Sequence, residues 1–458
     1  MDLSDKKMLA EAVARISNFL GLTIDPGLKE SYLNGCYPEL LSYRKDGASE
    51  PGIPVIQKYI LGVESYLAQP SLKRYYDIIR VARVVPLVVV LDRALSSLTD
   101  KRVVGYEDRV KKLIRETKFD SFESILFELV VAARYAIQPS VSSVTFIPES
   151  PKTQRPDLEV RIDGVTYFVE CKKQDRKSDA AEEIGKTVER KIQRVLKLLH
   201  RKDTSAILEL SFHQDPAQIS DIKLKDLVFE SLRSRVAVID TEITVRAIET
   251  PVAPLRTYSL FPSYGYYADH FGYDPDGEWQ ILTPALDCIW KSPSWLDQVR
   301  WQTATMWKVT NQDILWRIKR LGYKLIFKGL DQLRQAGHDI ILHYWFERDR
   351  AIGHRQKELL HLGETLKEKN LINFSWMIFN DVSPSISPRG RFDFVENSHI
   401  LAGTARKTSD PPVTGVFVSE DQTAEGLAEF GVGHSLPPID EDDESWQKKS
   451  LMRDPKQD

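Results

Sequence analysis

The spacing of hydrophobic residues changes along the chain, and this change predicts which parts are helical and which contain strands. Up to about residue 118 apolar residues recur at every third or fourth position, as Leu9, Val13, Ile16 and Leu20 do, which is typical of amphipathic helices. From residue 119 onwards, such segments are interrupted by short runs in which apolar and polar residues alternate, as they do in β-strands. We therefore expect an α/β fold in which residues 1–118 form an all-helical accessory domain.

The stretch from residue 119 to 212 is the most informative, because its elements follow an α-β-β-β-α-β order. Asp120 or Ser121 can cap the first helix. Asp163 and Gly164 separate two alternating segments, and a two-residue link of this kind is the strongest short-range signal for a β-hairpin. The expected elements are a helix at 120–137, strands at 144–147, 157–162 and 165–172, a helix at 179–200 and a strand at 206–212.

Helices and strands continue to alternate in the later part of the chain, and we expect these elements to extend one mixed α/β sheet. Helices are expected near 224–235, 302–335 and 355–368, and strands near 242–248, 340–346 and 372–379. We assign residues 119–400 to one domain with extensions and 401–458 to a C-terminal extension. The acidic run from Asp440 to Glu444 and the polar residues around it predict disorder from about residue 435.

The register of the hairpin follows from its turn, because partners are found by counting outward from the two loop residues. Lys172 lies two positions after Glu170, so both side chains are expected on the same face of their strand. The count pairs Ile162 with Val165, Val160 with Tyr167, and Asp157 with Glu170.

Two carboxylates held side by side, at Asp157 and Glu170, repel one another unless a cation or a proton is shared between them. A hard divalent ion relieves this repulsion, and Mg²⁺ is typically held by one or two carboxylates together with substrate phosphate oxygens. The backbone carbonyl of Cys171 could supply another ligand. An ammonium group at Lys172 could orient or deprotonate a water molecule and stabilise a phosphorane. The arrangement predicts hydrolysis of phosphodiesters with Mg²⁺ or Mn²⁺.

The combination of Pro156-Asp157, twelve intervening residues and Glu170-Cys171-Lys172 resembles the PD-(D/E)xK nuclease superfamily. The resemblance covers residues 119–212 and implies a restriction-endonuclease-like fold, with a helix before a three-strand meander and a second helix and a fourth strand after it. It also implies DNA as the substrate and a role in bacterial restriction or antiphage defence. Family members commonly carry a further acid on the first helix; Glu128 is the matching position, and Glu123 is the weaker candidate.

Several basic residues could bind nucleic acid, although a solvated surface explains them as well. The helix expected at 179–200 carries cations interleaved with acids, and here a salt-bridged face and a phosphate-binding face are equally favoured. The other candidates are Lys173, Arg176 and Lys177 after the hairpin, and Arg317, Arg320, Lys324 and Lys328 along the later helix.

Composition narrows the alternatives. The 458 residues are 42% hydrophobic and 28% charged, with a net charge of −3, so any contact with nucleic acid must be local. Three widely separated cysteines, no signal peptide and no apolar run long enough to cross a membrane predict a cytoplasmic protein. No Walker loop and no zinc-binding histidine spacing occur. A non-catalytic nucleic-acid-binding or assembly subunit remains the alternative, and a homodimer or an activating partner protein remains open.

Overall fold

The computed structural model is an α/β protein with two β-sheets. It describes residues 3–33, 52–68, 78–150, 155–174, 179–249, 280–292, 295–319, 323–334, 339–347, 355–371, 373–386, 392–405, 411–413 and 415–417. The tail for which disorder was predicted lies outside these residues. Among the helices that are described, none is long and apolar enough to cross a membrane.

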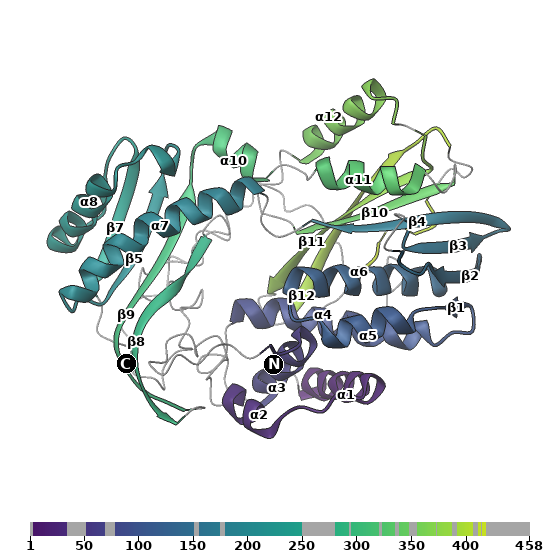
Figure 1. Cartoon of the computed structure of the whole chain (residues 1–458), viewed down its shortest axis with the longest axis horizontal. Coiled ribbons are helices and arrows are strands. Elements are labelled where there is room, and N and C mark those ends of the chain that lie inside the picture. The colour runs from purple at the N-terminus through teal and green to yellow at the C-terminus, as the bar shows by residue number, and fades with distance from the viewer. Residues whose placement is uncertain are drawn as a thin grey trace.

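The larger sheet is mixed and has seven strands in the order β1-β2-β3-β4-β10-β11-β12 (Figure 1). The meander β2-β3-β4 is antiparallel, β10 lies parallel to β4, and β11 lies parallel to β10. Its strands are β1 (Val103–Val104), β2 (Val141–Phe146), β3 (Leu158–Ile162), β4 (Val165–Lys173), β10 (Ile340–Glu347), β11 (Trp376–Ile386) and β12 (Phe392–Ala402).

Helices cover both faces of this sheet. One face packs against helices from the first part of the chain, and the other packs against two later helices (Figure 1). The first layer comprises α1 (Leu3–Leu20), α3 (Val55–Ala68), α4 (Ile78–Leu98), α5 (Glu107–Arg115) and α6 (Phe119–Ala136), with α2 (Pro26–Leu33) packed on α3. The second layer comprises α11 (Tyr323–Arg334) and α12 (Arg355–Glu368).

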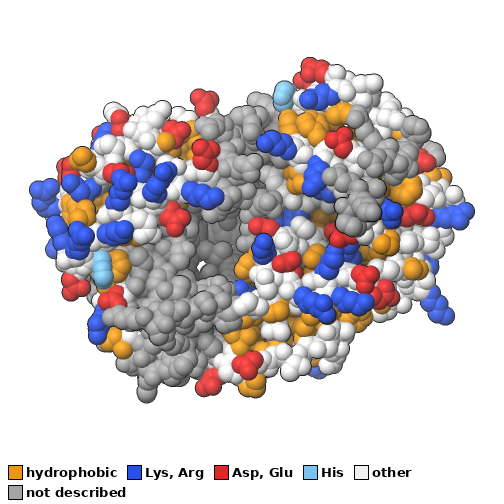
Figure 2. Space-filling model, in the orientation of Figure 1, with side chains coloured by type: hydrophobic (Ala, Val, Ile, Leu, Met, Phe, Trp, Pro, Cys, Tyr) orange, Lys and Arg blue, Asp and Glu red, His pale blue; other side chains and the backbone are white. Residues whose placement is uncertain are grey.

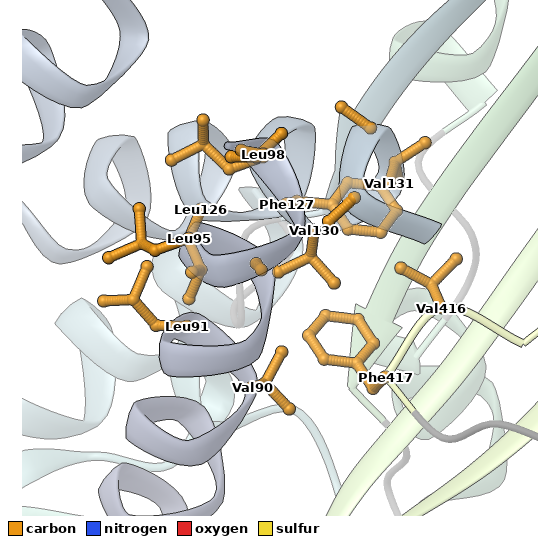
Figure 3. Packing of buried hydrophobic residues seen from close by; sticks show 14 of the residues in the cluster. Val90, Leu91, Leu95, Leu98, Leu126, Phe127, Val130, Val131, Val416 and Phe417 are labelled. Carbon is orange, nitrogen blue, oxygen red and sulfur yellow. The ribbon is translucent and has the colours of Figure 1, made fainter. Parts of the chain in front are cut away.

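The N-terminal helices and the sheet share one hydrophobic core. Residues of α1, α3 and α4 belong to the same buried cluster as residues of α6 and β2 to β4. Figure 3 shows α4 packed on α6, with Phe417 inserted beside Phe127. The rings of Phe127 and Phe417 are stacked at 6.0 Å, and Glu396 anchors this segment by accepting from the Phe417 N–H. The described helices before residue 119 therefore share their core with the sheet.

The smaller sheet corrects the expectation of a single sheet. It has the order β6-β7-β5-β9-β8 and lies in a second lobe with α7, α8 and α10 (Figure 1). The strand at 206–212, expected to close the sheet of the hairpin, joins this lobe instead, and β10 takes its place beside β4. The elements are α7 (Asp179–Arg201), β5 (Ala206–Phe212), α8 (Asp221–Ser234), β6 (Val238–Ile239), β7 (Ile243–Glu249), β8 (Gln280–Ser292), β9 (Trp295–Val309) and α10 (Gln312–Lys319).

The helix expected from 302 to 335 is not continuous. Residues 302–309 belong to β9, and the helical residues that follow are divided between α10 and α11. The strand was missed because β9 runs between β5 and β8, so consecutive side chains from Trp301 to Trp307 are buried and no polar alternation marks it.

Candidate active site

The hairpin that carries the candidate residues forms with the expected turn. Asp163 and Gly164 both have positive φ, at 49° and 81°, which is the conformation that a two-residue turn between twisted strands requires. The ladder confirms the predicted pairs in β3 and β4 and ends with Leu158 opposite Val169. The paired strands therefore hold the segment Glu170 to Lys172 at the point where β3 begins.

Asp157 does not pair with Glu170 as expected. The Asp157 N–H donates to the carbonyl of Val169, and Val169 is also the cross-strand partner of Leu158. Asp157 and Leu158 thus face the same residue, so the regular alternation of side chains along β3 does not extend to Asp157. Its carboxylate instead accepts from the Cys171 N–H, with Asp157 Oδ2 at 2.8 Å from the Cys171 nitrogen. The side chain of Asp157 thus lies at the edge of β4 rather than directly beside Glu170.

Glu170 and Lys172 share one face of β4, as predicted, and form an ion pair with each other. This face packs against the α11 layer. Glu170 stands opposite the buried Leu342 of β10, and a Cβ at Gly329 of α11 would lie only 3.4 Å from Lys172 Cγ. The absence of a side chain at Gly329 lets α11 approach the aliphatic part of Lys172 closely. The Glu170 carboxylate is consequently fully buried next to apolar side chains.

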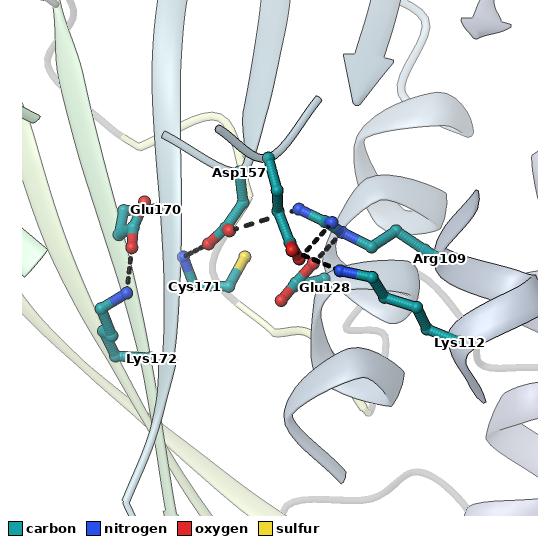
Figure 4. A network of polar contacts seen from close by, with 8 residues as sticks. Arg109, Lys112, Glu128, Asp157, Glu170, Cys171 and Lys172 are labelled. Atoms are coloured by element: carbon teal, nitrogen blue, oxygen red, sulfur yellow. Dashed lines mark hydrogen bonds and ion pairs between the residues drawn. The ribbon is translucent and has the colours of Figure 1, made fainter. Parts of the chain in front are cut away.

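Glu128 approaches the site from α6, on the opposite side of β4, where it is held by Arg109 of α5. Arg109 is 5% exposed, and its guanidinium also contacts Glu149 at 2.6 Å and Asp157 at 3.8 Å. In Figure 4, Glu170 and Lys172 lie on one side of β4 and Arg109 and Glu128 on the other, with the Asp157 carboxylate between them.

We call these five residues the acidic cluster: Arg109, Glu128, Asp157, Glu170 and Lys172. Sequence reasoning missed Arg109, because it lies in the segment assigned to the accessory domain. One signal was present: Arg109 stands on the apolar face of α5, together with the buried Val110 and Leu113. A cation on the buried face of an amphipathic helix indicates an anionic partner inside the protein.

Burial and mutual repulsion dominate the electrostatics of the acidic cluster. Burial and then the neighbouring Asp157 raise the pKa of Glu170 to about 8, against the opposing effect of Lys172. Burial likewise raises the pKa of Asp157, and burial and Asp157 raise that of Glu128 well above its ordinary value. Burial lowers the pKa of Lys172, but Glu170 and Asp157 outweigh this effect, so it is raised overall. Three carboxylates therefore share two cations inside the protein.

This excess of buried carboxylate is what a divalent cation would neutralise. Glu170 Oε2 is buried and, among the described residues, no group donates a hydrogen bond to it. Because the N–H and C=O of a strand residue point towards the same neighbouring strand, the carbonyl of Cys171 lies on the side of Asp157. Oxygen donors of this kind suit Mg²⁺ or Mn²⁺. As they stand, the described acids do not converge on one point, since Lys172 and Arg109 engage them.

Lys173 corrects a prediction, because it is not available to nucleic acid. It points to the α6 side of β4, where its side chain is 1% exposed and its ammonium lies 3.0 Å from Glu123 and 3.3 Å from Asp120. Glu123, the weaker candidate for a catalytic acid, also accepts a hydrogen bond of 2.8 Å from the Tyr59 hydroxyl. We call Tyr59, Asp120, Glu123 and Lys173 the anchor cluster, since they tie α3, α6 and β4 together.

The other residues proposed to bind nucleic acid are not gathered on one helix. Arg176, Lys177 and Arg320 lie outside the described residues. Arg317 belongs to α10 in the second lobe, whereas Lys324 and Lys328 are exposed on α11, above the larger sheet. The predicted stripe from 317 to 328 therefore does not exist as one helical face.

Comparisons of this chain with models of protein families, with curated proteins and with solved structures found no match.

Proposed function

We propose that the protein is a metal-dependent nuclease that hydrolyses phosphodiester bonds in DNA at the acidic cluster. The observation that carries this proposal is an excess of buried acid at the open end of the hairpin: among the described residues, Asp157, Glu170 and Glu128 meet only the cations Lys172 and Arg109, and the pKa of each acid is raised. Titratable groups that are perturbed together by burial and by one another are typical of active sites. The choice of DNA rests on the resemblance of the motif to PD-(D/E)xK nucleases.

The order of the elements supports the same proposal. The resemblance requires a helix, a three-strand meander, a second helix and a fourth strand, and α6, β2, β3, β4, α11 and β10 occur in that order around the site. The strand after α11 lies parallel to β4. The second lobe, from α7 to α10, is then an insertion between the meander and the second helix.

Each residue of the cluster has a role that its position permits. Asp157, Glu170 and the Cys171 carbonyl would hold the cation, with Glu128 as a further acid. The cation would supply Lewis-acid activation of the phosphodiester and neutralise charge that develops on it. Lys172 is placed to donate from Nζ to a phosphate oxygen or to orient the attacking water. Arg109 positions Asp157 and Glu128 and does not need to touch the substrate.

The test is cleavage of supercoiled plasmid and of single-stranded DNA in Mg²⁺ or Mn²⁺. Wild type should cut, while Asp157→Asn and Lys172→Met should lose at least about 100-fold in rate, because each removes a group needed in the transition state. Matched controls are Glu159→Gln, at an exposed acid of β3, and Lys101→Met, at an exposed lysine. Both should cut as wild type does.

Two results would contradict the proposal. Cleavage that persists in Asp157→Asn and Lys172→Met at the wild-type rate would place the activity elsewhere or in a contaminant. If neither wild type nor any variant cuts, while all bind DNA equally, the acidic cluster is structural. The protein would then be a non-catalytic nucleic-acid-binding or assembly subunit.

A further inference from the structure

A continuous stripe of basic side chains runs along the solvent-facing side of α7. Counting about 100° per residue, its five members fall within an arc of about 80° of the helix surface. The stripe covers about 22 Å of helix at 1.5 Å per residue. We call it the α7 stripe; all its members are exposed, and they are Lys186, Arg190, Arg194, Lys197 and Arg201. Figure 2 shows Lys and Arg side chains gathered on this lobe.

The carboxylates of the described residues leave the charges of Arg190, Lys197 and Arg201 unpaired. Arg194 forms an ion pair with Asp221 of α8, and Arg190 donates to the hydroxyl of Thr187, which is uncharged. Lys197 and Arg201 have no carboxylate within ion-pair distance among the described residues. Like charges three or four positions apart destabilise a helix. The repulsion within the stripe is therefore unfavourable for the stability of α7. Helix stability does not explain why the five cations share one side of the helix.

The other side of α7 is fully used in packing. Its apolar residues are buried against the smaller sheet and α8 in one core cluster: Ile184, Val188, Ile192, Val195, Leu196 and Leu199. A helix that binds a membrane surface must insert an apolar face into the lipid, and α7 has none left to insert. What remains on the solvent-facing side is a row of five cations, with the exposed acids Glu183 and Glu189 on the same helix. Such a row suits the regularly spaced phosphates of a nucleic acid.

We propose that the α7 stripe binds the phosphate backbone of a DNA duplex and holds it for cleavage at the acidic cluster. The choice of duplex DNA rests on the proposed nuclease function. Over the length of the stripe a duplex carries roughly a dozen phosphates, which is ample for five cations. Lys173 and Asp179 are six positions apart, so the start of α7 lies within roughly 22 Å of the end of β4. The stripe begins at Lys186, seven residues or about 10 Å further along α7, and a duplex of 30 base pairs is long enough to span the distance from the hairpin to the stripe.

The test measures binding of a fluorescent 30-base-pair duplex by anisotropy in EDTA, across a series of KCl concentrations. The variant Arg190→Gln/Lys197→Gln/Arg201→Gln is compared with wild type. Losing three phosphate contacts should reduce the slope of log K against log salt by roughly three and weaken binding at 100 mM KCl at least about tenfold. Its unfolding midpoint should be no lower than that of wild type, since none of the three residues packs in the core and their like charges are unfavourable for α7.

The matched control removes three exposed lysines elsewhere, in the variant Lys7→Gln/Lys101→Gln/Lys367→Gln. It should keep the wild-type affinity and slope, although its net charge changes by the same amount. Wild-type affinity and slope in the α7 variant would overturn the inference, as would a wild type that fails to bind duplex at 50 mM KCl. If the α7 variant loses binding only to phosphatidylserine vesicles, the partner is a lipid surface and the inference is wrong.

This outcome is separate from that of the proposed function. EDTA removes divalent ions, so binding is measured without cleavage, and Glu159→Gln, at an exposed acid outside the acidic cluster, should bind as wild type does. Duplex binding through the α7 stripe without any cleavage in Mg²⁺ or Mn²⁺ would contradict the nuclease activity and leave the stripe as a binding surface. Cleavage by the wild type together with unchanged binding of the α7 variant would contradict only the stripe.

Discussion

Two clusters of buried charge lie between α6 and its neighbours, and they differ in how their charges balance. In the anchor cluster the buried Lys173 and Glu123 neutralise each other, and Tyr59 donates a further hydrogen bond to Glu123. In the acidic cluster three carboxylates share two cations, and burial raises the pKa of Glu170 to about 8. The first is complete within the protein, whereas the second has the charge that an external cation would balance.

The difference teaches how to separate structural from functional charge in a buried network. Both clusters combine an acid from α6 with a lysine from β4, so residue type alone does not distinguish them. The count of buried charges does, because the Asp120 side chain is 55% exposed, which leaves one buried acid, Glu123, for one buried cation, Lys173. A network that is balanced by itself is expected to stabilise the fold, and one with excess charge is expected to be tuned for a ligand.

The largest effect is expected from breaking the anchor cluster. Lys173→Met removes the ammonium that lies 3.0 Å from the buried Glu123 carboxylate, and removing one partner of a buried ion pair costs about 3 to 5 kcal/mol in the free energy of unfolding. Urea denaturation of the variant measures this cost. The double variant Lys173→Met/Glu123→Gln should regain most of it, because no charge is then left alone. A loss below about 1 kcal/mol in the single variant would show that the pair is not structural.

A smaller effect of opposite sign is expected at Glu170 in metal-free protein. Its pKa rises from 4.5 to about 8 on folding. A raised pKa favours the protonated carboxyl, so the contribution of Glu170 to stability is present below pH 4.5 and is lost as the pH rises through about 8. The slope from this group reaches about 1.4 kcal/mol per pH unit within that window.

Glu170→Gln cannot ionise and should remove this slope. Compared with wild type, the variant should gain about 2 kcal/mol of unfolding free energy at pH 9 relative to pH 5, less than the full shift implies because Lys172 loses its partner. Urea denaturation in EDTA at both pH values measures the difference, with Glu159→Gln as the exposed control. Parallel pH profiles for wild type and Glu170→Gln would show that Glu170 is not under electrostatic stress.

The smallest effect on stability is expected at Gly329 of α11, which lies against Lys172 of the acidic cluster. In Gly329→Ala the new Cβ would lie 3.0 Å from Leu342 Cδ1 and 3.4 Å from Lys172 Cγ, so both must shift slightly. The gain in helix propensity, about 1 kcal/mol, should offset this strain, and the unfolding free energy should change by less than about 1 kcal/mol. The rate of DNA cleavage should nevertheless fall several-fold, because Lys172 is displaced. An unchanged rate would show that the position of Lys172 is not critical for cleavage. The control is Gly363→Ala in α12, where the added Cβ has no atom within 4 Å.

Local parts of the site were predictable from the sequence, because local chemistry specifies them. The turn at Asp163-Gly164 and the alternation on either side determine the register of β3 and β4, and with it the common face of Glu170 and Lys172. The orientation of Asp157 was not predictable. It depends on the hydrogen bond from the Asp157 N–H to the Val169 carbonyl, which ends the alternation of side chains along β3 at Leu158.

Long-range parts of the fold were not predictable from the order of elements. A strand that follows a helix must join a sheet, but the order of elements does not say which sheet. The strand β5 was therefore expected in the sheet of the hairpin, although it belongs to the sheet of the second lobe. The strand that pairs with β4 on the side away from β3 is β10, which begins at Ile340, after the whole second lobe in the sequence. Arg109 could not be assigned to the site for the same reason, since the order of elements does not show that α5 packs on α6.

The most direct test of the account is where a divalent cation binds. Crystals of the protein soaked in Mn²⁺ should show an anomalous peak coordinated by the carboxylates of Asp157 and Glu170, with Lys172 turned away from Glu170. The same soak of Glu170→Gln should show no peak there. A wild-type crystal with Mn²⁺ bound elsewhere, and with the Glu170–Lys172 and Arg109–Glu128 pairs unchanged, would contradict the central claim that the acidic cluster is a metal-dependent active site.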